Sequence, residues 1–215
     1  VTMTPGDCGS RETNPEETAR IRRGEAGKAA ILLGASYECA EFRDMAIFND
    51  DSSRRRVCEL IRRQTPAIVL TAAPIDYHTD HEATSVLVRD ACFAASAPNY
   101  ETGGDAAALD AIPHLYFMDS TSGVDRSGND LLADLYVDVE ADMETKKAAL
   151  AAHASQRDWL RRQHGIDDYL IQMETWTRIV GRRAGLRYAE GFRRYLGHPY
   201  PQTPLLEEAL GLLAV

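Results

Sequence analysis

The chain has 215 residues, of which 44% are hydrophobic and 27% charged, and its net charge is −9. This balance is typical of a soluble globular protein, and the acidic charge argues against general binding to nucleic acid or anionic membrane, because phosphates attract clustered positive charge. No apolar run reaches the ~20 residues that span a bilayer, and the first residues do not form a secretory signal. The four cysteines form no CxxC pair, which favours free thiols in a reducing cytoplasm. We therefore expect a cytoplasmic protein.

The first part of the chain predicts a strand, a loop and a helix. Residues 1–4 are expected to form a short strand that runs into a loop with two glycines. Because a domain rarely begins inside a strand, we expect that upstream sequence is missing. Asn14 can cap a helix that starts at Pro15, with Glu17 closing a capping box, and Gly34 can end it in the left-handed conformation.

Strands and helices alternate in the rest of the chain. Residues 67–71 form a continuous apolar run, which is typical of a parallel strand covered on both faces. A capping box at residues 79–82 predicts a helix that ends near residue 95. Two further strands are expected at residues 114–118 and 135–139, and two helices at 141–164 and 167–184. This alternation predicts an α/β fold with a mostly parallel sheet in one domain, residues 1–215.

The most informative stretch lies between the strand at residues 67–71 and the next helix, and it reads Asp76-Tyr77-His78-Thr79-Asp80-His81. In open α/β sheets, ligands bind just beyond the carboxyl ends of strands. His81 is expected in the first helical turn, where the helix dipole favours the neutral imidazole that a metal ligand must be. The carboxylate of Asp80 can orient one of the two histidines by accepting its ring N–H. A polar turn whose histidines only cap the helix remains the alternative.

Residues 78–84, HTDHEAT, resemble the HxDHxAT motif of the PIG-L/LmbE-like zinc-dependent N-deacetylases. Further motifs of that family follow in order: residues 4–10 (TPGDCGS), 22–25 (RRGE), 42–44 (FRD), 152–156 (AHASQ) and 188–192 (YAEGF). The resemblance runs from residue 1 to about residue 192. It implies a Rossmann-like fold with helices on both faces of the sheet. It also implies hydrolysis of an N-acetyl group, commonly on an amino sugar, with Zn²⁺ as the cofactor.

The resemblance also implies roles for five residues. His81 matches the zinc-binding histidine. His78 matches the catalytic histidine that stabilises the oxyanion when protonated, and Asp80 the carboxylate that holds it. Arg22 and Asp44 match substrate-binding positions, although either could belong to a surface ion pair.

One departure concerns the A-H-P-D-D-E motif, which supplies two zinc ligands and the general base in the family and which this sequence lacks. Only one of the three expected protein ligands is present, whereas a catalytic zinc normally has three. We therefore expect the chain by itself to bind zinc poorly and to hydrolyse nothing.

Three functions remain open. The first is a metal-dependent N-deacetylase acting on a small N-acetylated molecule, such as an amino-sugar conjugate. The second is an inactive homologue that binds a sugar or a partner and has lost the metal. The third, a metal phosphoesterase, ranks last because two-metal sites need more carboxylates and histidines than this cluster offers. The sequence leaves an oligomer possible.

Overall fold

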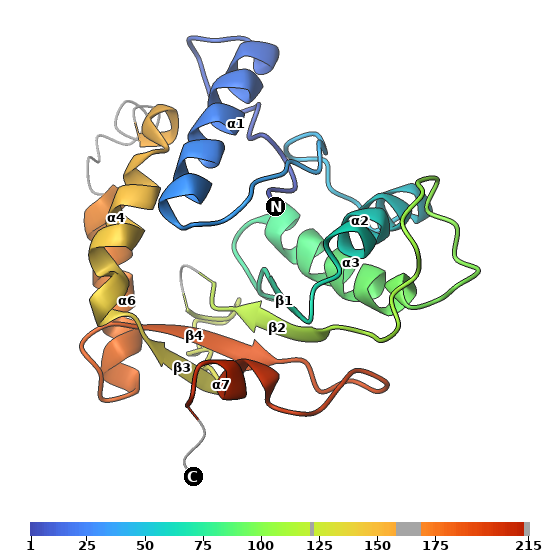
Figure 1. Cartoon of the computed structure of the whole chain (residues 1–215). Helices are drawn as coiled ribbons and strands as arrows, with labels where there is room; N and C mark the ends of the chain where they lie inside the picture. The colour runs from blue at the N-terminus through green and yellow to red at the C-terminus, as the bar shows by residue number, and fades with distance from the viewer. Residues whose placement is uncertain (121–122, 158–168, 213–215) are drawn as a thin grey trace. The chain divides into compact units, whose positions relative to one another are not determined.

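The computed structural model of the chain describes residues 1–120, 123–157 and 169–212 (Figure 1). The chain forms two compact units. Unit 1 consists of residues 1–46 and 136–190, and unit 2 of residues 47–135 and 191–215. No helix among the described residues is long and apolar enough to cross a membrane.

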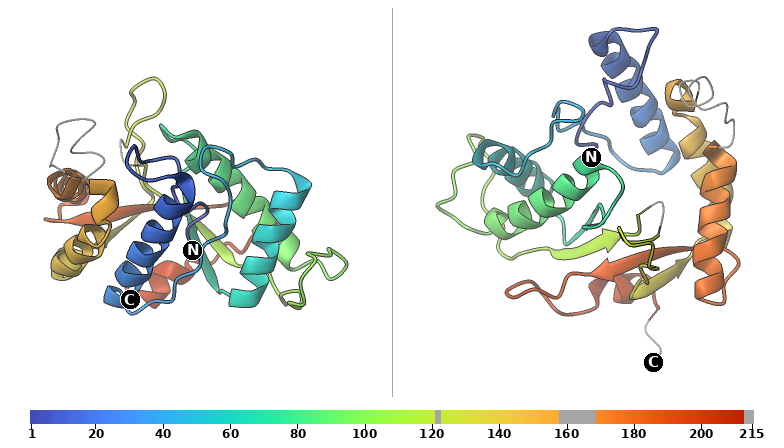
Figure 2. Two further views of the ribbon diagram at one scale, coloured as in Figure 1. Left: turned by 90° about the horizontal axis from the view of Figure 1, so that it is seen from above. Right: turned by 180° about the vertical axis from the view of Figure 1, so that it is seen from behind.

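Unit 1 is built mainly from helices: α1 (Pro15–Leu32), the short 3-10 helix η1 (Glu140–Asp142), α4 (Met143–Ala151) and α6 (Tyr169–Arg183). Helix α4 packs against both α1 and α6, and Figure 2 shows these helices from two further sides. The side chain of Asn14 accepts the N–H of Glu17 at 2.9 Å, so the expected N-cap is confirmed. Gly34, just after the helix, has the expected positive φ, 64°.

Two expectations for unit 1 are wrong. Residues 1–4 form no strand, and Thr2 forms an isolated parallel bridge with Cys39. The partner segment leaves the extended conformation at Glu41, whose φ is 58°, so no regular ladder forms, although Phe42 donates its N–H to the carbonyl of Met3 at 3.0 Å. The helix expected at residues 141–164 breaks after α4, where Ser155 donates its N–H and its hydroxyl to the buried carboxylate of Glu25 on α1, at 2.8 and 2.7 Å. Residues 158–168 lie outside the described part of the chain.

Unit 2 contains helices α2 (Asp51–Gln64), α3 (Thr79–Ala95) and α7 (Leu205–Ala209) with strands β1 (Ile68–Thr71) and β2 (His114–Met118). The expected strands and the helix α3 are confirmed within a residue at each end. Helices α2 and α3 pack against each other, and α3 contacts both strands. The core between them contains fully buried side chains, among them Cys58, Leu87, Cys92 and Leu115.

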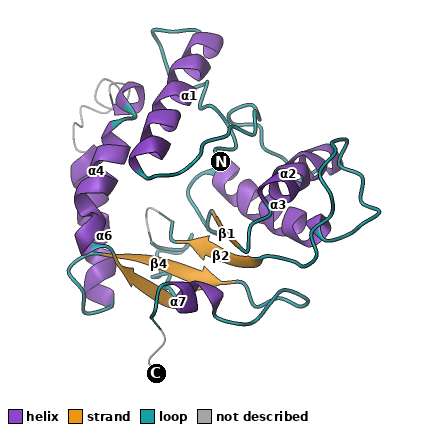
Figure 3. Cartoon of the chain, viewed as in Figure 1, coloured by secondary structure: helices purple, strands orange, loops and turns teal. Residues whose placement is uncertain are grey.

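The four-stranded sheet has the order β1-β2-β4-β3, with β3 at Leu135–Asp138 and β4 at Ala189–Arg194 (Figure 3). Strands β1 and β2 are parallel, with Leu70 opposite Tyr116, whereas β4 is antiparallel to β2, with Arg193 opposite Phe117. The α/β class is therefore confirmed, but the sheet is mixed and the expectation of a mostly parallel sheet is wrong. Strand β4 could not be predicted from the sequence, because its charged residues and Gly191 hide the apolar pattern of a strand.

The parallel pairing of β1 and β2 decides where unit 2 can place a site. Parallel strands end at the same edge of a sheet, and ligands in α/β folds bind beyond that edge. The segment of residues 72–82, which follows β1, and the loop that begins at Asp119 after β2 therefore start from one edge.

Candidate functional site

The segment that joins β1 to α3 carries both histidines of the HxDH motif. His78 is the N-cap of α3, and its Nδ1 accepts the backbone N–H of Asp80 at 3.2 Å. The cap expected at Thr79 is therefore wrong by one residue. The carboxylate of Glu82 does not complete a capping box with Thr79, because its Oε1 accepts the backbone N–H of Asp76 at 3.0 Å.

Asp76 is the carboxylate that contacts a histidine ring, and the sequence analysis missed this role. Its side chain is 5% exposed. Its Oδ1 lies 2.9 Å from Nδ1 of His81 and accepts the backbone N–H of His78 at 3.0 Å. An available signal was its position two residues before His78, because Asp in a turn commonly accepts the N–H two residues on.

These contacts give the two rings opposite tautomers. An ionised carboxylate only accepts hydrogen bonds, so the neutral ring of His81 carries its proton on Nδ1 and keeps a lone pair on Nε2. Nδ1 of His78 accepts an N–H, so the proton of that neutral ring is on Nε2. The rings are stacked, with their centroids 4.8 Å apart. Protonation of His78 at Nδ1 would oppose the N–H of Asp80 and break the cap.

Asp80 lies on the first turn of α3 and is 6% exposed. Its Oδ1 accepts the backbone N–H of Ile47 at 3.4 Å, which ties the segment before α2 to the start of α3. Its backbone N–H donates to Nδ1 of His78. The expected role of the Asp80 carboxylate in holding His78 stays a prediction.

Arg22, one of the two expected substrate-binding residues, lies on α1 in unit 1. Its Nη1 donates to the carbonyl of Gly6 and its Nη2 to the carbonyl of Gly9, both at 2.7 Å. Gly6 has a φ of 68°, a conformation that favours glycine, and a Cβ there would lie 2.6 Å from Nη1 of Arg22. Burial lowers the pKa of Arg22, and the charge of Asp44 opposes that shift. Arg22 therefore holds the loop of residues 6–9 in place.

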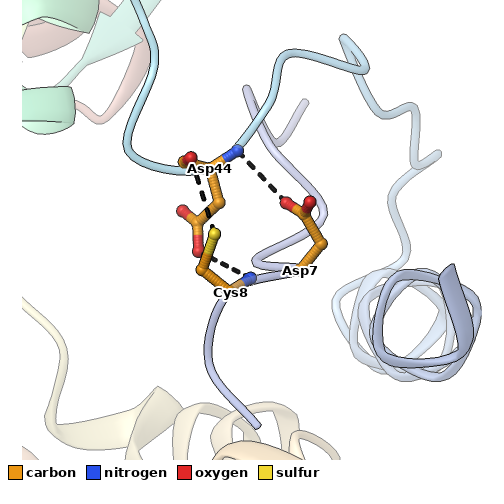
Figure 4. Close-up of side chains that lie close together, drawn as sticks. All are labelled: Asp7, Cys8 and Asp44. Atoms are coloured by element: carbon orange, nitrogen blue, oxygen red, sulfur yellow. Dashed lines mark hydrogen bonds between the residues drawn. The ribbon is translucent and has the colours of Figure 1, made fainter. Parts of the chain in front are cut away.

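Asp44, the second expected substrate-binding residue, lies beside the same loop and converges with Asp7 and Cys8 (Figure 4). Possible ligand atoms of these three residues lie within 4.8 Å of one another. Asp44 donates its N–H to Oδ1 of Asp7 at 3.1 Å, and Cys8 donates its N–H to Oδ2 of Asp44 at 3.3 Å. The protein itself thus satisfies these carboxylates.

The expected site residues thus fall into two groups. Unit 2 brings His78, Asp80 and His81 together, and unit 1 brings Arg22 and Asp44 close enough to interact electrostatically.

The donors around His81 do not by themselves fit a catalytic zinc. Such an ion takes three protein ligands and keeps one open position. Within the described ranges, the only set of three converging ligand groups is Asp7, Cys8 and Asp44, and it does not include His81. His81 is oriented as a zinc ligand would be, by a carboxylate on its other ring nitrogen. The part of the chain that the structure describes therefore supplies one prepared ligand and not a complete site.

A cavity of about 590 Å³ lies elsewhere in unit 2. It is lined by Arg62, Arg63, Ala67 and residues 106–111, among others. Ala67 immediately precedes β1, whereas the histidines follow that strand, so the cavity lies at the opposite end of β1. It is therefore separate from the HxDH segment.

Comparison with known proteins points to one family. Residues 1–92 match the family model for PIG-L, described as GlcNAc-PI de-N-acetylase. The N,N′-diacetylchitobiose deacetylase of Pyrococcus horikoshii is 25% identical, with a TM-score of 0.73, and the match covers 94% of this chain and 75% of that one.

Two further solved structures share the fold. GalB, the 4-carboxy-2-hydroxymuconate hydratase of Pseudomonas putida KT2440, is 23% identical with a TM-score of 0.67, and the match covers 90% of this chain and 79% of that one. Teicoplanin deacetylase Orf2, solved in a zinc-inhibited form, is 18% identical with a TM-score of 0.55, covering 86% and 78%. Since one of these proteins is a hydratase, the fold alone does not specify deacetylation.

Proposed function

Because the chain belongs to the PIG-L/LmbE-like deacetylase family, we propose that it acts in the hydrolysis of an N-acetyl group on a small amino-sugar conjugate, with His81 as one ligand of a zinc ion. The observation that carries this proposal is the different partner of Nδ1 in the two histidines, the Asp76 carboxylate for His81 and the Asp80 N–H for His78. His81 presents a lone pair on Nε2, and His78 presents an N–H on Nε2. One ring is thus prepared to bind a cation and the other to donate a hydrogen bond.

His78 has the chemistry of an oxyanion donor even as a neutral ring. Its Nε2–H can donate to the oxygen that becomes negative when the acetyl carbonyl is attacked. Removal of one such donor typically costs ~3 to 4 kcal/mol of transition-state stabilisation. The hydrogen bond that Nδ1 accepts from Asp80 leaves the proton of the neutral ring on Nε2, so the donor is in place before the substrate arrives.

Arg22 and Asp44 serve the substrate in different ways under this proposal. Arg22 shapes the loop of residues 6–9 through two carbonyls. The carboxylate of Asp44, which is only partly buried, accepts a hydrogen bond from a sugar hydroxyl. Zinc as the metal follows from the family resemblance, and two further ligands and a general base must join His81 before hydrolysis proceeds.

The test measures zinc content and acetate release together. The protein isolated from its natural source is assayed with N,N′-diacetylchitobiose and N-acetylglucosamine conjugates, alongside the 215-residue chain. We expect zinc-dependent acetate release by the natural protein, its loss together with zinc in His81→Ala, and loss of rate with retained zinc in His78→Ala. The 215-residue chain is expected to bind zinc weakly and to release no acetate. Retention of zinc by His81→Ala would contradict the ligand assignment.

The incomplete ligand set also supports a second candidate, an inactive homologue that binds an acetylated sugar without cleaving it. Titration calorimetry with the same compounds separates the two functions. Binding without acetate release by the natural protein, at any zinc concentration, would favour the inactive homologue over the deacetylase.

A further inference from the structure

Glu82 links the HxDH segment to the loop that follows β2. It lies on the first turn of α3, one residue after His81. Its Oε1 accepts the backbone N–H of Asp76 at 3.0 Å, and its Oε2 accepts Nη2 of Arg126 at 2.5 Å. Both contacts lie within unit 2. One carboxylate therefore holds two segments that are 50 residues apart in the chain.

The Asp76 end of this link leads to His81. The Asp76 side chain is buried, and its Oδ1 accepts both the ring N–H of His81 and the backbone N–H of His78. The position of that carboxylate depends on where the Asp76 backbone lies, and Glu82 bonds to that backbone. Glu82 therefore acts on His81 through Asp76.

The Arg126 end is presented by a loop with its own hydrogen bonds. Asp125 accepts the N–H groups of Ser127 and Asn129 at 2.7 and 2.9 Å, and Val124 pairs with Asp130 in an antiparallel bridge. These bonds hold the turn that carries Arg126. Its side chain is 72% exposed, and an ion pair at that exposure contributes little to stability. We therefore look for the effect of this ion pair at Asp76, whose backbone N–H Glu82 accepts.

We propose that Glu82 and Arg126 are a pair of positioning residues that hold Asp76 and so keep the proton of His81 on Nδ1 and its lone pair on Nε2. The use of that lone pair for a metal rests on the function proposed above. The effect of Glu82 and Arg126 on the tautomer of His81 is independent of that function, because the tautomer is set in the metal-free protein. A group that orients a metal-bound histidine typically changes metal affinity 10- to 100-fold.

The test compares Glu82→Ala, Glu82→Gln and Arg126→Gln with Arg20→Gln as the control. Arg20 is 71% exposed and paired with Glu17 on α1 in unit 1, so it matches Arg126 in exposure and charge. The Gln at position 82 keeps an oxygen that can accept the N–H of Asp76, whereas Ala removes it. The readouts are the ¹⁵N shifts of the His81 ring in metal-free protein and the zinc affinity by calorimetry.

We expect Glu82→Ala to move the ring of His81 toward a mixture of tautomers and to weaken zinc binding about 10-fold. Glu82→Gln should restore most of the wild-type ring shifts, and Arg126→Gln should give a smaller change than Glu82→Ala. Wild-type ring shifts in folded Glu82→Ala would overturn the proposal. If Glu82→Ala does not fold, wild-type ring shifts in Arg126→Gln, which removes the ion-pair partner of Glu82, overturn it. Absence of zinc binding by the protein from its natural source would contradict the proposed function, and the ring shifts would still decide the positioning role.

Discussion

Asp76 Oδ1 lies 2.9 Å from Nδ1 of His81, and only 5% of the Asp76 side chain is exposed. The contact joins a loop residue to the first turn of α3 and fixes which nitrogen of His81 is protonated. A buried carboxylate behind a histidine is the arrangement that supports metal ligation in proteins. Asp76 therefore orients the ring of His81.

Replacement of Asp76 by Asn should weaken metal binding at His81. The amide can present an oxygen to the ring N–H, but it lacks the negative charge that raises the basicity of the ligand. We expect zinc affinity to fall about 10- to 100-fold, as measured by calorimetry. Asp51→Asn, an exposed carboxylate on α2, is the control and should leave affinity unchanged. Equal affinities for all three proteins would contradict the role of Asp76.

Arg22→Met should destabilise the loop of residues 6–9. The variant keeps an apolar stem but leaves the carbonyls of Gly6 and Gly9 without their charged donor. Since hydrogen bonds to charged groups are worth ~1.5 to 3 kcal/mol each and the site is partly exposed, we expect a loss of about 2 kcal/mol in the free energy of unfolding. Denaturant unfolding measures it. Arg20→Met, in an exposed pair with Glu17, should change stability little, and equal effects would argue against the loop contact.

Two glycine-to-alanine substitutions should change the stability of the protein in opposite directions. A Cβ at Gly191 would overlap the buried carboxylate of Asp119, so Gly191→Ala should cost about 1 to 3 kcal/mol. Gly24, inside α1, has no atom near its Cβ position, so Gly24→Ala should stabilise the protein by ~0.5 to 1 kcal/mol. Thermal and denaturant unfolding measure the change in the free energy of unfolding for each variant. Stabilisation by Gly191→Ala would show that the strand and Asp119 can separate without cost.

The stabilising contribution of Glu82 should depend on pH. The hydrogen bond from the backbone N–H of Asp76 lowers the pKa of Glu82, with a further contribution from Arg126. Because the pKa is lower in the folded than in the unfolded state, the contribution is present above the unfolded value and is lost as the pH falls through the folded value. The difference in stability between wild type and Glu82→Gln should therefore shrink below about pH 4.5. A difference that grows on acidification would contradict this sign.

The cysteines should differ sharply in reactivity. Burial raises the pKa of Cys92 to about 12 and also raises that of Cys58, whereas Cys8 is exposed. Because the thiolate is the reactive form, N-ethylmaleimide at pH 8 should modify Cys8 in the folded protein and spare Cys58 and Cys92. Peptide mass spectrometry locates the label. Denatured protein, in which all four cysteines react, is the control, and rapid labelling of Cys92 in folded protein would show that the α2–α3 core opens.

The sequence alone determined the features that depend on neighbouring residues. The cap at Asn14 needs only the N–H three residues on, and the apolar runs of β1 and β2 form strands because they match a buried environment. The placement of the HxDH motif between a strand and a helix is local in the same way, which is why it could be predicted.

The tertiary structure decided what depends on residues far apart in the chain. The pairing of β4 with β2 made the sheet mixed, and the contact of Glu25 with Ser155 accompanies the break of the long helix expected after residue 141. Within the HxDH segment, a turn brought Asp76 onto the ring of His81. Residue spacing does not predict this contact, because the direction in which a turn side chain points depends on the folded backbone.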